Sequence, residues 1–160
     1  MTSASHLAQF NIARLRAPLT DPSMSQFVAG LDTINALADS SPGFVWRLAE
    51  GPAGDATTVR PFDPDVFITL SVWASIESVR EFSYQSAHLD YLRRRRDWFL
   101  PHDFPASLVL WWIPAGHIPT VGEACERLER VADGPTPDAF TFRTSFPAPA
   151  RPHREAHLPA

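Results

Sequence analysis

The order of strand-like and helix-like patterns is the feature that most constrains the fold of this 160-residue chain. Four stretches alternate or are rich in β-branched and aromatic residues, and they predict strands at 6–15, 44–48, 66–73 and 107–113. Three stretches have helical spacing and capping residues, and they predict helices at 23–41, 75–99 and 120–134. The predicted order is therefore β-α-β-β-α-β, followed by one more helix.

This order predicts an α+β fold of the ferredoxin-like kind, in which a four-stranded antiparallel sheet carries helices on one face. We expect residues 6–146 to form a single domain and the proline-rich segment 147–160 to be a flexible tail. The helices would leave the other face of the sheet bare, and such a face usually needs a partner. We therefore expect a homodimer in which a second copy closes a barrel.

Alternation within the strands divides their side chains into two faces. We expect the helices to cover an apolar face made of Phe10, Ile12, Phe44, Trp46, Leu48, Val66, Ile68, Leu70, Val72, Leu108 and Leu110. The opposite face is polar and aromatic, and it carries Gln9, Asn11, Arg47, Thr69, Ser71, Trp73 and Trp111. We expect this second face to line either the interior of a dimer barrel or a ligand pocket.

Composition and charge exclude several classes of protein. The net charge of −4 disfavours a nucleic-acid binder, because such domains are usually basic. The single cysteine, Cys125, permits neither an intramolecular disulfide nor a thiolate zinc cluster. No apolar run reaches about 18 residues and the N-terminus does not resemble a secretory signal, so we expect a cytoplasmic protein without a membrane span.

The second predicted helix contains four consecutive arginines in the stretch AHLDYLRRRRDWF. On a regular helix Arg93 and Arg96 point into the apolar stripe, whereas Arg95 lies beside His88 at its edge. A buried guanidinium must be paired, so we expect its partner to be an internal carboxylate, carbonyl groups of the following loop or the carboxylate of a ligand.

His88 is the main candidate for chemistry, because a histidine can act as an acid, a base or a metal ligand near neutral pH. Tyr84 and Tyr91 share its side of the helix. A structural role for His88 at the edge of the core remains the alternative. The sequence contains no metal-binding spacing such as HExxH and no glycine-rich phosphate loop, so we expect neither a dedicated metal site nor a nucleotide cofactor.

Several long segments resemble the DUF3291 proteins, a bacterial family of unknown function. These segments include LDTINALADSSPGFVWRL, HLDYLRRRRDWF and LVLWWIPAGHIPTVGEACERL. The family is similar in fold to the dimeric α/β-barrel superfamily, which includes antibiotic-biosynthesis monooxygenases and haem-degrading monooxygenases. One such fold hosts many functions, so the resemblance implies the fold more than the activity.

The resemblance to the haem-degrading branch is partial. In that branch a Trp-x-Ser segment begins the helix that carries the axial histidine, and Trp73-Ala74-Ser75 matches it here, with Asn11 on the first strand. Phe82 stands where the branch has a second tryptophan, and His88 follows Phe82 more closely than the axial histidine would. The resemblance therefore implies a possible haem site with His88 as ligand, but with two departures.

These observations leave three hypotheses. The first is an enzyme of secondary metabolism without a cofactor, of monooxygenase or cyclase/isomerase type, that acts on a flat, largely apolar, polyketide- or polyphenol-like substrate. We predict His88 and Asn11 as catalytic residues, and the following as ligand-binding residues: Trp46, Arg47, Trp73, Phe82, Tyr84, Tyr91, Arg95, Trp111 and Trp112. The second hypothesis is a haem protein, and the third is a dimeric ligand-binding domain without catalysis.

Overall fold

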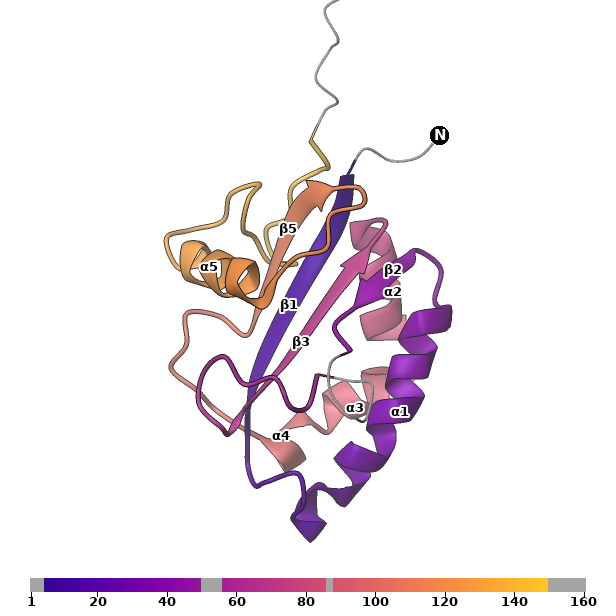
Figure 1. Cartoon of the computed structure of the whole chain (residues 1–160), viewed down its shortest axis with the longest axis vertical. Coiled ribbons are helices and arrows are strands. Elements are labelled where there is room, and N and C mark those ends of the chain that lie inside the picture. The colour runs from indigo at the N-terminus through magenta and orange to yellow at the C-terminus, as the bar shows by residue number, and fades with distance from the viewer. Residues whose placement is uncertain (1–4, 50–55, 86–87, 150–160) are drawn as a thin grey trace, which may run out of the picture.

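The computed structural model describes residues 5–49, 56–85 and 88–149, and it has an antiparallel sheet as its centre (Figure 1). The longest strand, β1 (Ser5–Leu15), pairs with β3 (Val66–Trp73) along one edge and with β5 (Leu108–Pro114) along the other. β2 (Phe44–Arg47) pairs with the outer edge of β3. The prediction of an α+β fold with an antiparallel sheet is confirmed.

The sheet has five strands in the described residues, rather than the four that the sequence predicted. The additional strand, β4 (Phe99–Leu100), is only two residues long and pairs with Arg14 and Leu15 at the end of β1. It forms because the chain leaves its helical stretch in an extended conformation at Phe99, with φ −123° and ψ 144°.

Helices lie on both sides of the strands, and none in the described part of the chain is long and apolar enough to cross a membrane (Figure 1). They are a short 3-10 helix, η1 (Pro22–Met24), and five α-helices: α1 (Ser25–Ser40), α2 (Ile76–Gln85), α3 (His88–Arg93), α4 (Arg95–Trp98) and α5 (Val121–Val131). Asp21 caps η1 by accepting from the Ser23 amide at 2.9 Å, and Thr120 caps α5 by accepting from the Glu123 amide at 3.1 Å.

The single regular helix predicted for residues 75–99 is wrong, because it is interrupted within the described residues: α3 ends at Arg93 and α4 begins at Arg95. Arg94 separates these two helices. Its amide bonds to the Tyr91 carbonyl and its carbonyl accepts from the Asp97 amide, both over three residues rather than four. This tighter turning changes which side chains face inward after Tyr91.

The predicted burial of Arg93 and Arg96 is therefore also wrong, since all four arginines of the run are exposed. Trp98 takes the inward position instead and is only 2% exposed. Tyr91 stacks on it with ring centroids 5.9 Å apart, and the Arg94 guanidinium lies 4.7 Å from the centre of its ring.

Both faces of the sheet are covered within one chain, and the predicted assignment of the faces is reversed. The face that carries Gln9, Asn11, Thr69 and Ser71, which we call the cavity face, lies under α1 to α4. The apolar face lies on the other side and is covered by α5 and by residues 56–62 and 104–106. The sequence-based argument for a bare face, and with it the reason given for a homodimer, does not hold for this arrangement.

The covering of the apolar face has a clear physical cause. Ala124 and Leu128 on α5 are fully buried against Phe10 and Trp111 of the sheet, so the amphipathic helix α5 covers the apolar face in place of α1 and α2. A register shift in β2 moves Phe44 to the opposite side from Trp46. Of the predicted tail, residues 150–160 lie outside the described part of the chain.

α1 and α3 approach each other closely at Gly30. A Cβ atom at this position would overlap the ring of Tyr91, which lies on α3. Gly30 is buried within α1, where glycine is otherwise unfavourable. The missing side chain therefore lets Tyr91 lie between the two helices.

We expect Gly30→Ala to destabilise the fold by roughly 1–3 kcal/mol, because the added methyl group overpacks this contact. Gly122→Ala is the matched control, since a Cβ there meets only the Thr120 hydroxyl oxygen at 3.9 Å. This control should be neutral or stabilise by about 0.4–1 kcal/mol. Urea unfolding of both variants measures the difference, and equal free energies of unfolding would contradict the close contact.

Candidate functional site

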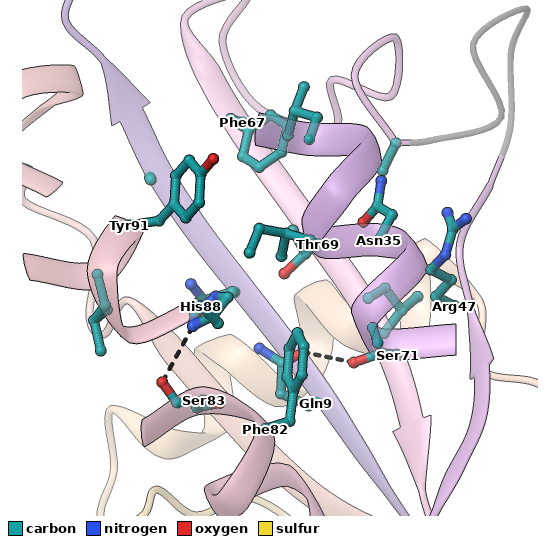
Figure 2. A pocket seen from close by; sticks show the side chains of 18 of the residues that line it. Gln9, Asn35, Arg47, Phe67, Thr69, Ser71, Phe82, Ser83, His88 and Tyr91 are labelled. Atoms are coloured by element: carbon teal, nitrogen blue, oxygen red, sulfur yellow. Dashed lines mark hydrogen bonds between the residues drawn. The ribbon is translucent and has the colours of Figure 1, made fainter. Parts of the chain in front are cut away.

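A cavity of about 210 Å³ lies between the cavity face of the sheet and helices α1 to α4 (Figure 2). Its floor carries polar side chains from the two central strands, namely Gln9, Asn11, Thr69 and Ser71. They share one face because Gln9 pairs with Ser71 and Asn11 with Thr69 in the register of β1 and β3. A strip of hydrogen-bonding groups therefore runs beneath largely apolar helices.

An aromatic wall closes one end of the cavity. Trp73 at the end of β3 stacks on Phe82 of α2, with centroids 5.1 Å apart and planes inclined by 28°. Phe82 in turn lies 5.0 Å from the ring of His88. Three rings from three elements therefore lie next to one another along this wall, which makes this end of the cavity aromatic.

His88 stands at the start of α3 and faces this cavity (Figure 2). Its Nδ1 lies 3.2 Å from the Ser83 carbonyl oxygen, which can only accept a hydrogen bond. The proton of the neutral ring is therefore on Nδ1, and Nε2 carries the lone pair. Burial lowers the pKa of His88 and outweighs the Ser83 bond, which acts in the opposite direction. The ring is thus neutral at pH 7 and able to accept a proton.

Hydrogen bonds fix the floor of the cavity next to the aromatic wall. The indole Nε1 of Trp73 donates to the Ser71 hydroxyl oxygen at 2.9 Å. The Ser71 hydroxyl donates to Oε1 of Gln9 at 2.8 Å. One side chain of the wall therefore determines the orientation of two side chains on the floor.

Two arginines line the cavity and differ in their partners. Arg47 on β2 forms an ion pair with Asp39 of α1, with Nε 2.8 Å from Oδ1. Arg95 donates only to the Leu92 carbonyl at 3.3 Å, and no carboxylate of the described residues lies within ion-pair distance of it. Arg95 therefore has donors available to an anionic or polar group of a ligand.

The structure brings most of the predicted site residues together. The cavity is lined by the two predicted catalytic residues, His88 and Asn11, and by five of the predicted ligand-binding residues: Arg47, Trp73, Phe82, Tyr91 and Arg95. These residues come from β1, β2, β3, α2, α3 and α4, so the site depends on the tertiary fold rather than on one sequence motif.

The other four predicted ligand-binding residues lie outside the cavity. Trp46 and Trp111 are on the apolar face under α5, because they pair with Val72 and Ala8. Trp112 packs against the C-terminal segment and donates to the Phe146 carbonyl at 2.9 Å. Tyr84 is 47% exposed and contacts the ring of Phe142.

Sequence reasoning placed Gln9, Thr69 and Ser71 on this face but did not select them as site residues. The signal was the two-residue alternation itself, since Gln9 is two positions from Asn11 and Ser71 is two positions from Trp73. Asn35 of α1 also lines the cavity and was missed. It lies one helical turn after Leu31, another lining residue, and this spacing could have identified it.

The cavity is small for a haem, which the resemblance to the haem-degrading branch implied. The Nε2 lone pair of His88 suits a metal ligand, because the other ring nitrogen is held by a carbonyl group. However, a cavity of about 210 Å³ is smaller than the roughly 300–1,000 Å³ that sites for drug-sized ligands occupy, and a haem is larger still than many of these ligands. No group of three potential metal ligands occurs within residues 5–49, 56–85 and 88–149.

The chain belongs to the family described as a domain of unknown function, DUF3291, whose model matches residues 6–156. The family predicted from the sequence is therefore confirmed. No curated protein matches the chain.

Comparison with solved structures gives distant similarities. SnoaB, a cofactor-independent oxygenase from Streptomyces nogalater, is 14% identical, with a TM-score of 0.46 over 72% of this chain and 97% of that one. The NE2512 protein of unknown function from Nitrosomonas europaea is 13% identical, with a TM-score of 0.45 over 73% and 97%. Because these scores lie below 0.5, the function of the chain has to be argued from its own residues.

The lowered pKa of His88 predicts a pH-dependent stability. Above the ordinary histidine pKa of about 6.5, the ring is neutral in both the folded and unfolded states. In that range it does not make the free energy of unfolding depend on pH. As the pH falls below that value, the unfolded chain takes up a proton that the folded chain resists, so the free energy of unfolding falls.

We expect the free energy of unfolding of His88→Gln to fall less at low pH than that of the parent chain, because the variant lacks the ring that resists protonation. Urea unfolding between about pH 5 and pH 8 measures this difference. His117→Gln is the matched control, because this histidine is on the surface beside Glu123 and the variant leaves His88 in place. If His88→Gln and the parent chain lose stability in parallel, the ring of His88 is not held neutral by burial.

Proposed function

We propose that this chain binds a small, flat aromatic molecule in the cavity and removes a proton from it through His88. The observation that carries the proposal is a half-buried neutral imidazole, with its lone pair on Nε2, in a cavity whose walls are aromatic and whose floor is polar. A general base of this kind needs a pKa below the working pH and a substrate held against it.

The volume of the cavity limits the size of the substrate. An apolar cavity of about 150 Å³ is able to hold benzene. The present volume of about 210 Å³ therefore suits one ring with substituents, or two compact fused rings. This is a narrower class than the polyketide- or polyphenol-like substrates expected from the sequence.

The walls and the floor would give the substrate a defined orientation. A flat ring packed along Trp73 and Phe82 gains about 0.5–1.5 kcal/mol for each favourable aromatic pair. The Asn11 amide on the floor supplies a hydrogen bond that is directed by the strand rather than by a mobile loop. Together these contacts would place one acidic O–H or C–H group of the substrate opposite His88.

Proton removal is the step that the two predicted reaction types share. The Nε2 lone pair takes the proton, and the electron pair of the broken bond remains on the substrate as an anion. In an isomerase or a cyclase this anion rearranges, whereas in a cofactor-independent oxygenase it reacts with dioxygen. The chain would need only to bind the substrate and to stabilise its anion, which agrees with a site that has few charged groups.

Hydrogen exchange tests this proposal without knowledge of the natural substrate. 2-Indanone is a compact two-ring ketone, and the hydrogens beside its carbonyl exchange with deuterium when a base removes them. In D₂O we expect the chain to accelerate this exchange and His88→Gln to lower the acceleration by roughly 10²–10⁴-fold, the usual contribution of a general base. The acceleration should also fall as the pH drops through the lowered pKa of His88.

Two controls separate binding from chemistry. Calorimetry should show that His88→Gln still binds 2-indanone, while Tyr84→Ala, altered outside the cavity, should retain both binding and exchange. Binding without accelerated exchange would identify a non-catalytic ligand-binding domain. Absence of binding would contradict the proposal as a whole. Oxygen consumption in the presence of oxidisable substrates, measured with an oxygen electrode, would distinguish an oxygenase from an isomerase or a cyclase.

A further inference from the structure

We propose that the substrate is a ring compound whose oxygen becomes an anion in the reaction, a phenol or an enolisable cyclic ketone, and that the Gln9 amide N–H holds this oxygen. The inference rests on the proposed function, because it gives the other half of the proton transfer that His88 begins. It assigns Gln9 as a catalytic residue, and Ser71 and Trp73 as the residues that position it.

The hydrogen bonds along the floor run in one direction. The indole N–H of Trp73 can only donate, so the Ser71 oxygen must accept from it at 2.9 Å. The hydroxyl hydrogen of Ser71 is then directed to the next group, which is Oε1 of Gln9 at 2.8 Å. The series of hydrogen bonds therefore begins at the indole of Trp73 in the aromatic wall and ends at the Gln9 amide.

This direction determines which end of the Gln9 amide faces the cavity. If the amide were turned over, Ser71 would accept two N–H bonds, and no other described residue would accept its hydroxyl hydrogen. The observed orientation satisfies both the indole and the hydroxyl group. The amide oxygen of Gln9 therefore faces Ser71, and its NH₂ group is directed away from Ser71 on the side where His88 enters the cavity (Figure 2).

The NH₂ group of Gln9 has no acceptor among the residues that the structure describes, although two groups support the other end of the amide. Gln9 is half-buried, so this NH₂ group is not sealed in the core. Because Gln9 lines the cavity, a bound molecule can supply the missing acceptor. The site therefore presents a fixed N–H donor together with the proton acceptor of His88.

A donor and an acceptor that face one cavity select a particular kind of oxygen. A phenol can donate its hydrogen to Nε2 of His88 while its oxygen accepts from Gln9. When the proton moves to Nε2, the electron pair stays on the substrate oxygen, and the Gln9 N–H then binds a negative charge. Hydrogen bonds to charged oxygens are stronger than those to neutral ones, so this contact stabilises the product of proton transfer more than the starting state.

4-Nitrophenol tests the inference, because its anion is coloured and nitrobenzene offers the same ring without the hydroxyl group. We expect the chain to bind 4-nitrophenol more tightly than nitrobenzene and to favour its anion, so that the bound probe turns yellow at a lower pH than in water. Gln9→Met keeps the length of the side chain and removes the donor. It should weaken 4-nitrophenol binding by about 10-fold and leave nitrobenzene binding unchanged.

Variants of the two positioning residues test the direction of the hydrogen bonds. Trp73→Phe keeps an aromatic ring and removes the indole N–H, and Ser71→Ala removes the hydroxyl group. Both should raise the pH at which the bound probe turns yellow, whereas Ser71→Thr, which retains a hydroxyl group, should restore it. A merely structural role would change the binding of both probes and leave this pH unaltered.

Each outcome distinguishes the inference from the proposed function. If nitrobenzene and 4-nitrophenol bind equally well and Gln9→Met changes neither, the role of Gln9 is overturned while the cavity remains a ligand site. If Gln9→Met weakens both probes alike, the side chain only shapes the cavity and the inference is again overturned. If neither probe binds, the proposed function and the inference both fail.

Discussion

The pairing of β1 with β3 is the constraint on which the rest of the structure depends. Its register places Gln9 and Asn11 opposite Ser71 and Thr69, and so brings four polar side chains under the helices. Such groups cannot be packed against apolar side chains without loss of hydrogen bonds. The layer between the sheet and α1 to α4 therefore contains a cavity, whereas the apolar face packs densely against α5.

Burial has two chemical consequences in this cavity. It lowers the pKa of His88, and the Ser83 carbonyl fixes which nitrogen carries the proton, so the ring is a base at neutral pH. It also makes the orientation of Gln9 depend on Ser71, because few other partners are present. The aromatic wall connects these effects, since Trp73 stacks on Phe82 and also supplies the first hydrogen-bond donor to the floor.

The sequence predicted the strands and the polar face well, because alternation and β-branched residues are local signals. It did not predict which face the main helices cover, since alternation separates two faces without saying what packs on each. The broken helix at Arg94 was missed because helical spacing assumes regular geometry, and this error placed Arg93 and Arg96 in the core. His88 was selected for its chemistry, whereas Gln9 acquires its importance only from hydrogen bonds made across the sheet.

A crystal structure of the chain with 4-nitrophenol tests the central claim most directly. The account predicts that the phenol oxygen lies within hydrogen-bond distance, about 2.5–3.2 Å, of both Nε2 of His88 and the amide nitrogen of Gln9. It also predicts that the ring lies along Trp73 and Phe82. A probe bound only through Arg95, or with its oxygen away from His88 and Gln9, would contradict the account.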